Sequence, residues 1–310
     1  MTPVCGKGGK NVNTTKTIKR SREDVIFDTV TTILLLLVFV IVAYPLFFVL
    51  IASVSDPYKV LNGEVMLFPK GFNLDAYKRI FQDNTIWRGY WNTILYTVVG
   101  TALNVALTMT LAFPLSRKYF SGRKVITAIL LITMYFSGGM IPTYLLVKSM
   151  GLRDTFWVMI FLGSVSAYNV IIARTFLESN ISGELEEAAA IDGCSKGRFF
   201  FSMVLPLSKA IIAVLVLYYA VAHWNDYMKG LLYLDSAERY PLQLVIRSIL
   251  IQTQMVANDA ADIADIDARM KLAEAMKYGV IIVSCVPTLI LYPFVQKHFV
   301  KGVMIGSVKG

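Results

Sequence analysis

The polar segment that begins at Ser182 carries the densest set of side chains able to make specific contacts. It contains a serine, three glutamates, three alanines, an aspartate and a glycine, in the order Ser182, Glu184, Glu186, Glu187, Ala188, Ala189, Ala190, Asp192 and Gly193. Serine favours a helix N-cap, glutamate suits the first turn, alanine favours the interior and glycine accommodates a left-handed C-terminal cap. We therefore expect a short helix whose carboxylates could pair with arginine or lysine of a protein partner. A solvated connector with ordinary alanines accounts for the same residues.

Polar and aromatic side chains inside apolar stretches form a second set of candidates. They are Asn104, Ser164, Asn169, Trp224, Asn225 and Asp226. Aromatic rings pack on apolar parts of a ligand while amides and carboxylates bind its polar groups, so these residues are candidates for a substrate path. Polar residues in membrane spans also form interhelical hydrogen bonds, and tryptophan also anchors helices at the membrane interface. The residue types leave both interpretations open.

Catalytic and metal-binding patterns are missing from the sequence. There is no Walker A phosphate loop, no nucleophile elbow and no set of paired zinc ligands. His223 and His298 have no cysteine or histidine partner at ligand spacing. We expect no catalytic residue, no metal and no cofactor in this chain. Any ATP that drives its function must then be hydrolysed by another protein.

The elements that position these residues are predicted to be membrane-spanning helices. Hydrophobic residues make up 56% of the 310 residues and charged residues 16%, whereas a soluble domain has about 25% charged residues. A helix needs roughly 20 apolar residues to cross a bilayer. Six stretches approach or meet this length, at 25–51, 94–115, 125–147, 156–177, 210–232 and 278–295. We predict an all-α membrane protein with six transmembrane helices.

Lysine and arginine residues indicate the orientation of these helices. Basic residues cluster in the N-terminal tail, near the C-terminus and in the loop that contains Arg117, Lys118, Arg123 and Lys124. Because cytoplasmic loops are enriched in lysine and arginine, both termini are expected in the cytoplasm. The chain then divides into a cytoplasmic tail at 1–24, a transmembrane domain at 25–297 with an inner loop at 178–209, and a cytoplasmic tail at 298–310. This topology explains the net charge of +9, so nucleic acid is not an expected partner.

Further helices are predicted on the outer side of the membrane. Apolar residues recur at helical spacing between Leu74 and Phe81, which indicates a short helix on the outer membrane surface. Pro241 opens a helical stretch that runs through Ile251. Gly138 and Gly139 interrupt the third apolar stretch, and such a break either borders a substrate path or is a packing kink.

The spacing within the inner loop resembles the EAA motif of permease subunits in binding-protein-dependent ATP-binding-cassette (ABC) importers. Gly193 follows the Glu-Ala-Ala triplet by four residues, and a Leu-Pro pair lies twelve residues after the glycine. In that family the loop forms coupling helices that sit in a cleft on the ATPase subunit. The resemblance implies a coupling role for Glu187, Ala188, Ala189, Asp192, Gly193, Leu205 and Pro206. The family often has proline where this chain has Gly183 and alanine where it has Cys194.

The resemblance covers nearly the whole chain, and some segments resemble one branch of the family more specifically. The stretches at 112–118, 135–142, 223–225 and 240–243 are similar to the carbohydrate-uptake branch, of the polysaccharide and lipoprotein type. The resemblance implies a type I importer permease that pairs with a second permease subunit to enclose the translocation path. It also implies two ATPase subunits that bind ATP, an extracellular substrate-binding lipoprotein and an oligosaccharide substrate. A peptide or polyol importer with the same fold is the alternative, and a polytopic membrane enzyme is a more distant one.

The C-terminal tail is similar to that of maltose-type permeases, which ends in Gly-Val-Lys-Gly. This chain ends in Val308, Lys309 and Gly310, with Ser307 where that pattern has its first glycine. The resemblance implies that the tail inserts between the two ATPase subunits. A membrane-surface anchor, with lysine near lipid phosphates and apolar residues in the interface, is the alternative.

Overall fold

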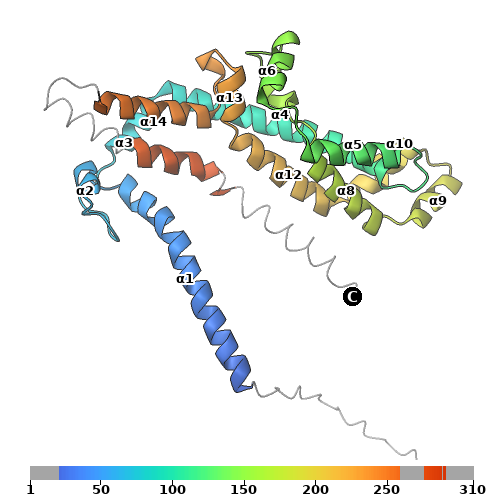
Figure 1. The fold of residues 1–310 in the computed structure, drawn as a ribbon, viewed down its shortest axis with the longest axis horizontal. Coiled ribbons are helices and arrows are strands. Elements are labelled where there is room, and N and C mark those ends of the chain that lie inside the picture. The colour runs from blue at the N-terminus through green and yellow to red at the C-terminus, as the bar shows by residue number, and fades with distance from the viewer. Residues whose placement is uncertain (1–20, 259–275, 288, 291–310) are drawn as a thin grey trace, which may run out of the picture. The chain divides into compact units, whose positions relative to one another are not determined.

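The computed structural model describes residues 21–258, 276–287 and 289–290. The chain divides into two units, residues 1–48 and residues 49–310. Figure 1 shows the described part, which consists of helices joined by short connections. The predicted all-helical fold is confirmed for these residues.

Helix α1 (Arg22–Ser53) supplies the described part of the first unit and continues into the second. Its most apolar window has a mean hydropathy of 3.1. Glu23 and Asp24 lie in its first turn, where the positive end of the helix dipole stabilises acidic side chains. A long helix without a polar face is typical of a span solvated by lipid. The apolar stretch predicted at 25–51 is therefore confirmed as a helix.

Two short helices follow α1 in the second unit. Helix α2 (Pro57–Leu61) begins after Asp56, whose carboxylate accepts a hydrogen bond from the Tyr58 amide at 2.9 Å. Helix α3 (Asp75–Gln82) buries Ala76 and Ile80 on one side. The helix predicted from the spacing between residues 74 and 81 is thereby confirmed.

Helix α4 (Asn84–Leu115) is the central element of the second unit (Figure 1). Asp83 caps it by accepting a hydrogen bond from the Thr85 amide at 2.8 Å. Its most extensive packing is against α12 (Lys209–Trp224), α8 (Ala167–Asn180), α14 (Leu242–Asn258) and α7 (Phe156–Phe161). Figure 1 shows α14 beside one end of α4 and α8 beside the other. Movement at either end of α4 would therefore reach several elements.

The third predicted stretch is broken, as its glycines indicate. Helices α5 (Arg123–Tyr135) and α6 (Met140–Ser149) form an angle of 115°. Gly139 precedes α6 with a φ of 88°, a conformation that side chains with a Cβ rarely adopt. The predicted interruption at Gly138 and Gly139 is confirmed.

The fourth predicted stretch, at 156–177, is not one continuous helix. Helix α7 ends at Phe161 and α8 begins at Ala167. Gly163 has a φ of 78°, and Ser166 caps α8 by accepting a hydrogen bond from the Asn169 amide at 3.4 Å. The chain therefore carries a non-helical break where hydropathy alone shows only a continuous run.

The inner loop and the fifth stretch consist of several short helices. The loop contains α9 (Gly183–Ile191), α10 (Lys196–Phe199), the π-helical turn η1 (Phe200–Val204) and α11 (Leu205–Leu207). The segment at 196–207 makes an angle of 80° with α12. Helix α12 ends at Trp224, and α13 (Met228–Tyr233) follows it, so the stretch at 210–232 is also divided.

Toward the C-terminus, the 3-10 helix η2 (Ala237–Arg239) leads into α14, which confirms the helix predicted after Pro241. A further apolar helix is described at Met276–Pro287. In the described part of the chain, α1 and α4 are each long and apolar enough to cross a membrane, and up to four spans result if each bent pair is one span. The predicted tail residues Val308, Lys309 and Gly310 lie outside the described residues.

Three apolar clusters hold the second unit together. The first joins the C-terminal half of α4 to α8, α9, α10 and α12. The second joins α3 and the start of α4 to α14 and Val280. The third packs α7 against Tyr96, Val147 and the end of α13. Helix α9 thus rests on the same core as the C-terminal end of α4.

Candidate functional site

Helix α9 is capped at both ends by its own residues. The Ser182 hydroxyl accepts a hydrogen bond from the Leu185 amide at 3.3 Å, as an N-cap serine does. At the other end Gly193 has a φ of 75°, and its amide donates to Ala190 O at 3.0 Å while the Cys194 amide donates to Ala189 O at 2.9 Å. These two bonds form a Schellman motif. The short helix predicted from the sequence, with its serine and glycine caps, is confirmed.

The two faces of α9 have different environments. Ala189 is buried and Leu185 is half-buried, and both pack on the first apolar cluster. Glu187 and Ala188 are exposed, and the side chain of Ile191 is 87% exposed. Ile191 therefore adds an exposed apolar side chain to a face that otherwise carries small and polar residues. Nothing in the sequence singled out Ile191 among the residues of this helix.

A buried arginine holds the inner face of α9. Arg117, just after α4, has its Nε atom 3.1 Å from Glu186 Oε2, and Nη1 donates a hydrogen bond to Ile181 O at 3.0 Å. Its guanidinium also lies 5.2 Å from the centre of the Phe113 ring, within range of a cation–π contact. In the sequence Arg117 indicates only the topology, because it lies far from Glu186 along the chain.

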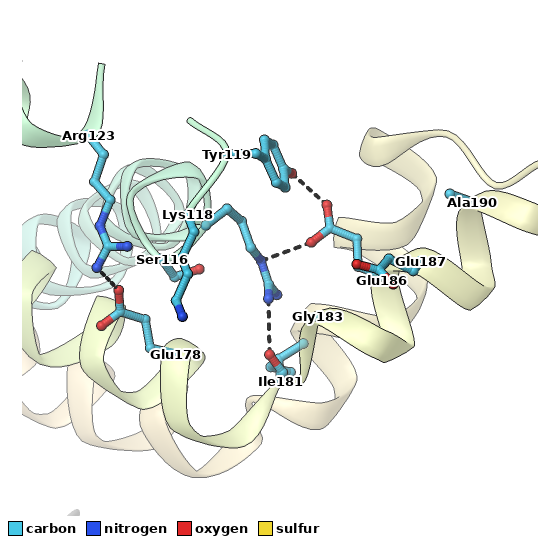
Figure 2. Close-up of a pocket in the computed structure, with 11 residues that line it drawn as sticks. Ser116, Lys118, Tyr119, Arg123, Glu178, Ile181, Gly183, Glu186, Glu187 and Ala190 are labelled. Atoms are coloured by element: carbon cyan, nitrogen blue, oxygen red, sulfur yellow. Dashed lines mark hydrogen bonds and ion pairs between the residues drawn. The ribbon is translucent and has the colours of Figure 1, made fainter. Parts of the chain in front are cut away.

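Tyr119 binds the second carboxylate oxygen of the same glutamate. Its hydroxyl donates to Glu186 Oε1 at 2.5 Å, and the ammonium group of Lys196 lies 4.0 Å from the centre of its ring. Figure 2 shows Tyr119 and Glu186 facing each other across this bond. Partial burial and the bond to Glu186 raise the pKa of Tyr119 to about 12, so the phenol stays protonated as a donor.

A pocket of about 730 Å³ lies between α9 and the loop that follows α4 (Figure 2). Charged side chains line it from both sides, with Arg117, Lys118 and Arg123 facing Glu178, Glu186 and Glu187. Arg123 forms an ion pair with Glu178, which also pairs with Arg174 at 3.3 Å. The predicted coupling residues Leu205 and Pro206 are not among its lining residues and lie in α11, before the 80° bend into α12.

The polar residues predicted inside the spans bind mostly to protein groups. Asn104 is buried and, with its amide turned to face acceptors, donates to Ser164 O at 3.3 Å and Gly100 O at 2.9 Å, while its oxygen accepts from His223 Nε2 at 3.0 Å. Gly100 leaves room for the imidazole, because a Cβ at that position would lie against the ring of His223. Tyr219 hydroxyl accepts from the Ser166 amide at 3.2 Å. These bonds satisfy backbone groups freed by the break between α7 and α8.

The remaining members of this set are divided between buried and more exposed positions. Trp224 is buried and donates from its indole to Ser284 O at 3.3 Å. Asn225 is exposed and donates to Val221 O at 2.9 Å, while Asp226 forms an ion pair with Lys229 at 2.8 Å. Asn169 is buried in α8. None of them, nor Asn104 or Ser164, lines the pocket beside α9, and their part in a substrate path stays a prediction.

A network of polar contacts joins two loops at the other end of the unit. Asp154, which has a φ of 53°, accepts hydrogen bonds from Asp235 N and Ser236 N at 3.1 Å each and from Ser236 Oγ at 2.6 Å. Arg239 pairs with the same carboxylate at 2.8 Å. The Ser236 hydroxyl, the two amides and Arg239 lower the pKa of Asp154 to about 2.

Comparison with known proteins places this architecture in a family. No family model matches the chain. Protein LplC of Bacillus subtilis (strain 168) is 38% identical over 294 residues, covering 95% of this chain and 98% of LplC. The polygalacturonan/rhamnogalacturonan transport system permease protein YtcP of the same organism is 39% identical over 285 residues, covering 92% of this chain and 99% of YtcP.

A solved structure is similar over the same extent. It is a bacterial ABC transporter involved in the import of the acidic polysaccharide alginate, with a TM-score of 0.82 and 31% identity. The match covers 91% of this chain and 100% of the matched chain. These identities are above 30% and extend over almost the full length of each protein, which shows the family. The chain belongs to the carbohydrate ABC transporter permeases and is a multi-pass membrane subunit of an importer, not an enzyme.

Proposed function

We propose that this chain forms half of the translocation path of an oligosaccharide importer and that α9 is its docking element for a separate ATPase. The observation that carries this proposal is the division of α9 into a face held by the protein and a face without described contacts. Ala189 packs inward, whereas Glu187, Ala188 and Ile191 project outward. Small residues let another backbone approach closely, Ile191 offers an apolar anchor, and Glu187 offers a partner for a basic side chain.

The proposed topology has six spans with both termini in the cytoplasm. Helices α1 and α4 supply the first two, the α5–α6, α7–α8 and α12–α13 pairs supply the next three, and the helix at Met276–Pro287 begins the sixth. Contacts between the basic loop after α4 and the loop that bears α9 support this orientation, since Arg117 binds Glu186 and Arg123 binds Glu178. Two inner loops must lie on one membrane side to meet in this way, and basic residues favour the cytoplasm.

The proposed partners follow from the importer family. They are a second permease subunit, two ATPase subunits that bind the ATP, an extracellular substrate-binding lipoprotein, membrane lipid and the sugar itself. The residues Asn104, Ser164, Asn169, Trp224, Asn225 and Asp226 remain proposed contributors to the path. The tail residues Val308, Lys309 and Gly310 remain proposed contacts of the ATPase pair.

The proposed substrate is an oligosaccharide, with acidic chains as the first candidates. One relative is named for polygalacturonan and rhamnogalacturonan, and the similar structure belongs to an importer of alginate. Isothermal titration of the importer's substrate-binding protein with oligogalacturonates, neutral maltodextrins and peptides would test the assignment. Binding of either saccharide class supports it, and exclusive binding of peptides would contradict it.

The coupling role of α9 is tested in proteoliposomes that contain the whole importer. We expect Glu187→Ala and Gly193→Pro to leave the chain inserted while uptake and substrate-stimulated ATP hydrolysis are lost. The first removes a charge partner, and the second removes the left-handed cap because proline cannot adopt a positive φ. Asp75→Ala, which removes an exposed carboxylate from α3, is the matched control. Wild-type uptake and hydrolysis in both α9 variants would overturn the proposal.

A further inference from the structure

We propose that Arg117 is a positioning residue that fixes the coupling helix to the transmembrane core, so that movement of α9 is passed to α4. This inference rests on the proposed docking of α9 on the ATPase and adds the link by which that docking acts. In this proposal the outer face of α9 meets the ATPase, whereas Arg117 fixes the angle of α9 relative to α4.

Arg117 contacts a different element with each part of its guanidinium. Nε lies 3.1 Å from Glu186 of α9, Nη1 donates at 3.0 Å to Ile181 at the end of α8, and the group stacks at 5.2 Å on Phe113 of α4. Nε and Nη2 are buried and neither makes a hydrogen bond among the described residues, so Nε contacts Glu186 as an ion pair. The arginine is 5% exposed and borders the pocket beside α9.

The chemistry of each contact suits arginine specifically. Ile181 is the C-cap of α8, and the last carbonyls of a helix need donors from outside it. Glu186 lies in the first turn of α9, so its carboxylate is held where the helix dipole already favours negative charge. A planar guanidinium can serve both acceptors and stack on a ring at once, whereas a lysine ammonium is a single point charge.

Apart from the hydrogen bond that the Tyr119 hydroxyl donates to Glu186 at 2.5 Å, the remaining attachments of α9 are less directional. Leu185 and Ala189 pack on the apolar cluster, but apolar contacts tolerate sliding and rotation better than fixed polar geometry. The caps of α9 come from Ser182 and Gly193, so the helix would still form without Arg117. Loss of Arg117 should therefore preserve the docking face while loosening its connection to α4, which packs on α12, α8, α14 and α7.

The test uses the complete importer in proteoliposomes with the chain variants Arg117→Met, Arg117→Lys and Glu186→Gln. Three quantities are measured, namely ATPase subunit retained on purification, stimulated ATP hydrolysis and sugar transported per ATP hydrolysed. We expect ATPase retention near the wild-type level and at least about a fivefold fall in sugar transported per ATP, the range of ordinary coupling between sites. Lys124→Met removes the same charge from an exposed site in the neighbouring helix α5 and should keep the ratio.

The sugar transported per ATP hydrolysed distinguishes a positioning defect from a folding defect. Misfolded chains reduce the amount of importer, but the importers that do assemble keep the wild-type value. We also expect Arg117→Met combined with Glu186→Gln to be no worse than Arg117→Met alone, since both variants break one link. Should Arg117→Met fail to assemble, Glu186→Gln decides. A fall in its ratio supports the inference, and an unchanged ratio overturns it.

Failure of this inference is distinguishable from failure of the proposed function. If Glu187→Ala uncouples transport but Arg117→Met and Glu186→Gln keep the wild-type ratio, docking stands and the positioning role falls. If Glu187→Ala and Gly193→Pro have no effect, the docking role of α9 falls first.

Discussion

Helix α9 and the polar cluster around Asn104 use similar residue types in opposite ways. Asn104, His223 and the Ser164 carbonyl bind one another inside the protein. In α9, by contrast, only the inner carboxylate of Glu186 is bound by the described chain, while Glu187 and Ile191 face outward. Polar groups in the first region complete the fold, and those of the second remain available to a partner.

This difference separates two effects that mutations in a permease can have. Residues of the buried cluster hold the non-helical break between α7 and α8, where unsatisfied backbone groups would be costly in a membrane. Changes there should lower stability. Changes on the outer face of α9 should leave stability unaltered and affect association with the ATPase. The following predictions test this separation, from the largest expected change in stability to the smallest.

The largest destabilisation is expected for Gly100→Ala. The added methyl group would meet the His223 ring and force it away from Asn104. Overpacking of this kind costs about 1–3 kcal/mol, and thermal unfolding of the chain in detergent would show a lower Tm. Gly138→Ala is the matched control, because a Cβ there meets nothing within 4 Å. Equal Tm values for the two variants would contradict the description of the cluster as closely packed.

Asn104→Leu should have an intermediate effect. The substitution removes the donor to Ser164 O and the acceptor for His223. Polar interactions between membrane helices are worth about 0.6 kcal/mol on average and up to roughly 1.7 kcal/mol, so the free energy of unfolding should fall by that amount. Transport by the variant, if its amount in the membrane is restored, also reports on the substrate path. Unchanged stability with abolished uptake would favour a substrate role over a packing role.

A smaller and pH-dependent effect is expected for Asp154→Ala. The folded-state pKa of about 2 lies below the ordinary value of 3.8, so the carboxylate stabilises the fold above pH 4 and loses this effect as the pH falls through 2. The difference in unfolding free energy between wild type and variant should be up to about 1 kcal/mol at pH 7, since the group is partly exposed. It should shrink at pH 2.5. A difference that is constant with pH would show that the network is held by other contacts.

The smallest change in stability is expected for Ile191→Ser. Its side chain is 87% exposed, and surface substitutions of this kind alter stability by less than about 0.5 kcal/mol. Affinity for the ATPase subunit should nevertheless fall by about tenfold or more, as expected for an apolar anchor worth more than 1.4 kcal/mol. Surface plasmon resonance with the purified subunits measures this. If the variant binds the ATPase subunit with wild-type affinity, Ile191 is not part of the docking face.

The features predicted correctly from the sequence are those that depend on residues close together in the chain. The caps of α9 were predictable because Ser182 and Gly193 act within a few residues of their own positions. The break near Gly163 was not, because one glycine in an apolar run has no strong local signal. The bond between Arg117 and Glu186 joins residues 69 positions apart, so only the folded chain brings them together. Ile191 was missed because its exposure depends on how α9 packs.

Cross-linking from the two faces of α9 tests the central claim most directly. Single cysteines are placed at Ile191 and at Ala189, after Cys5, Cys194 and Cys285 are replaced by serine, and a short bifunctional reagent is added to the assembled importer. The account predicts cross-links to the ATPase subunit from position 191, which is exposed, and few or none from position 189, which is 5% exposed. Equal cross-linking from both positions, or none from position 191 in an importer that transports sugar, would contradict the docking of α9 by its outer face.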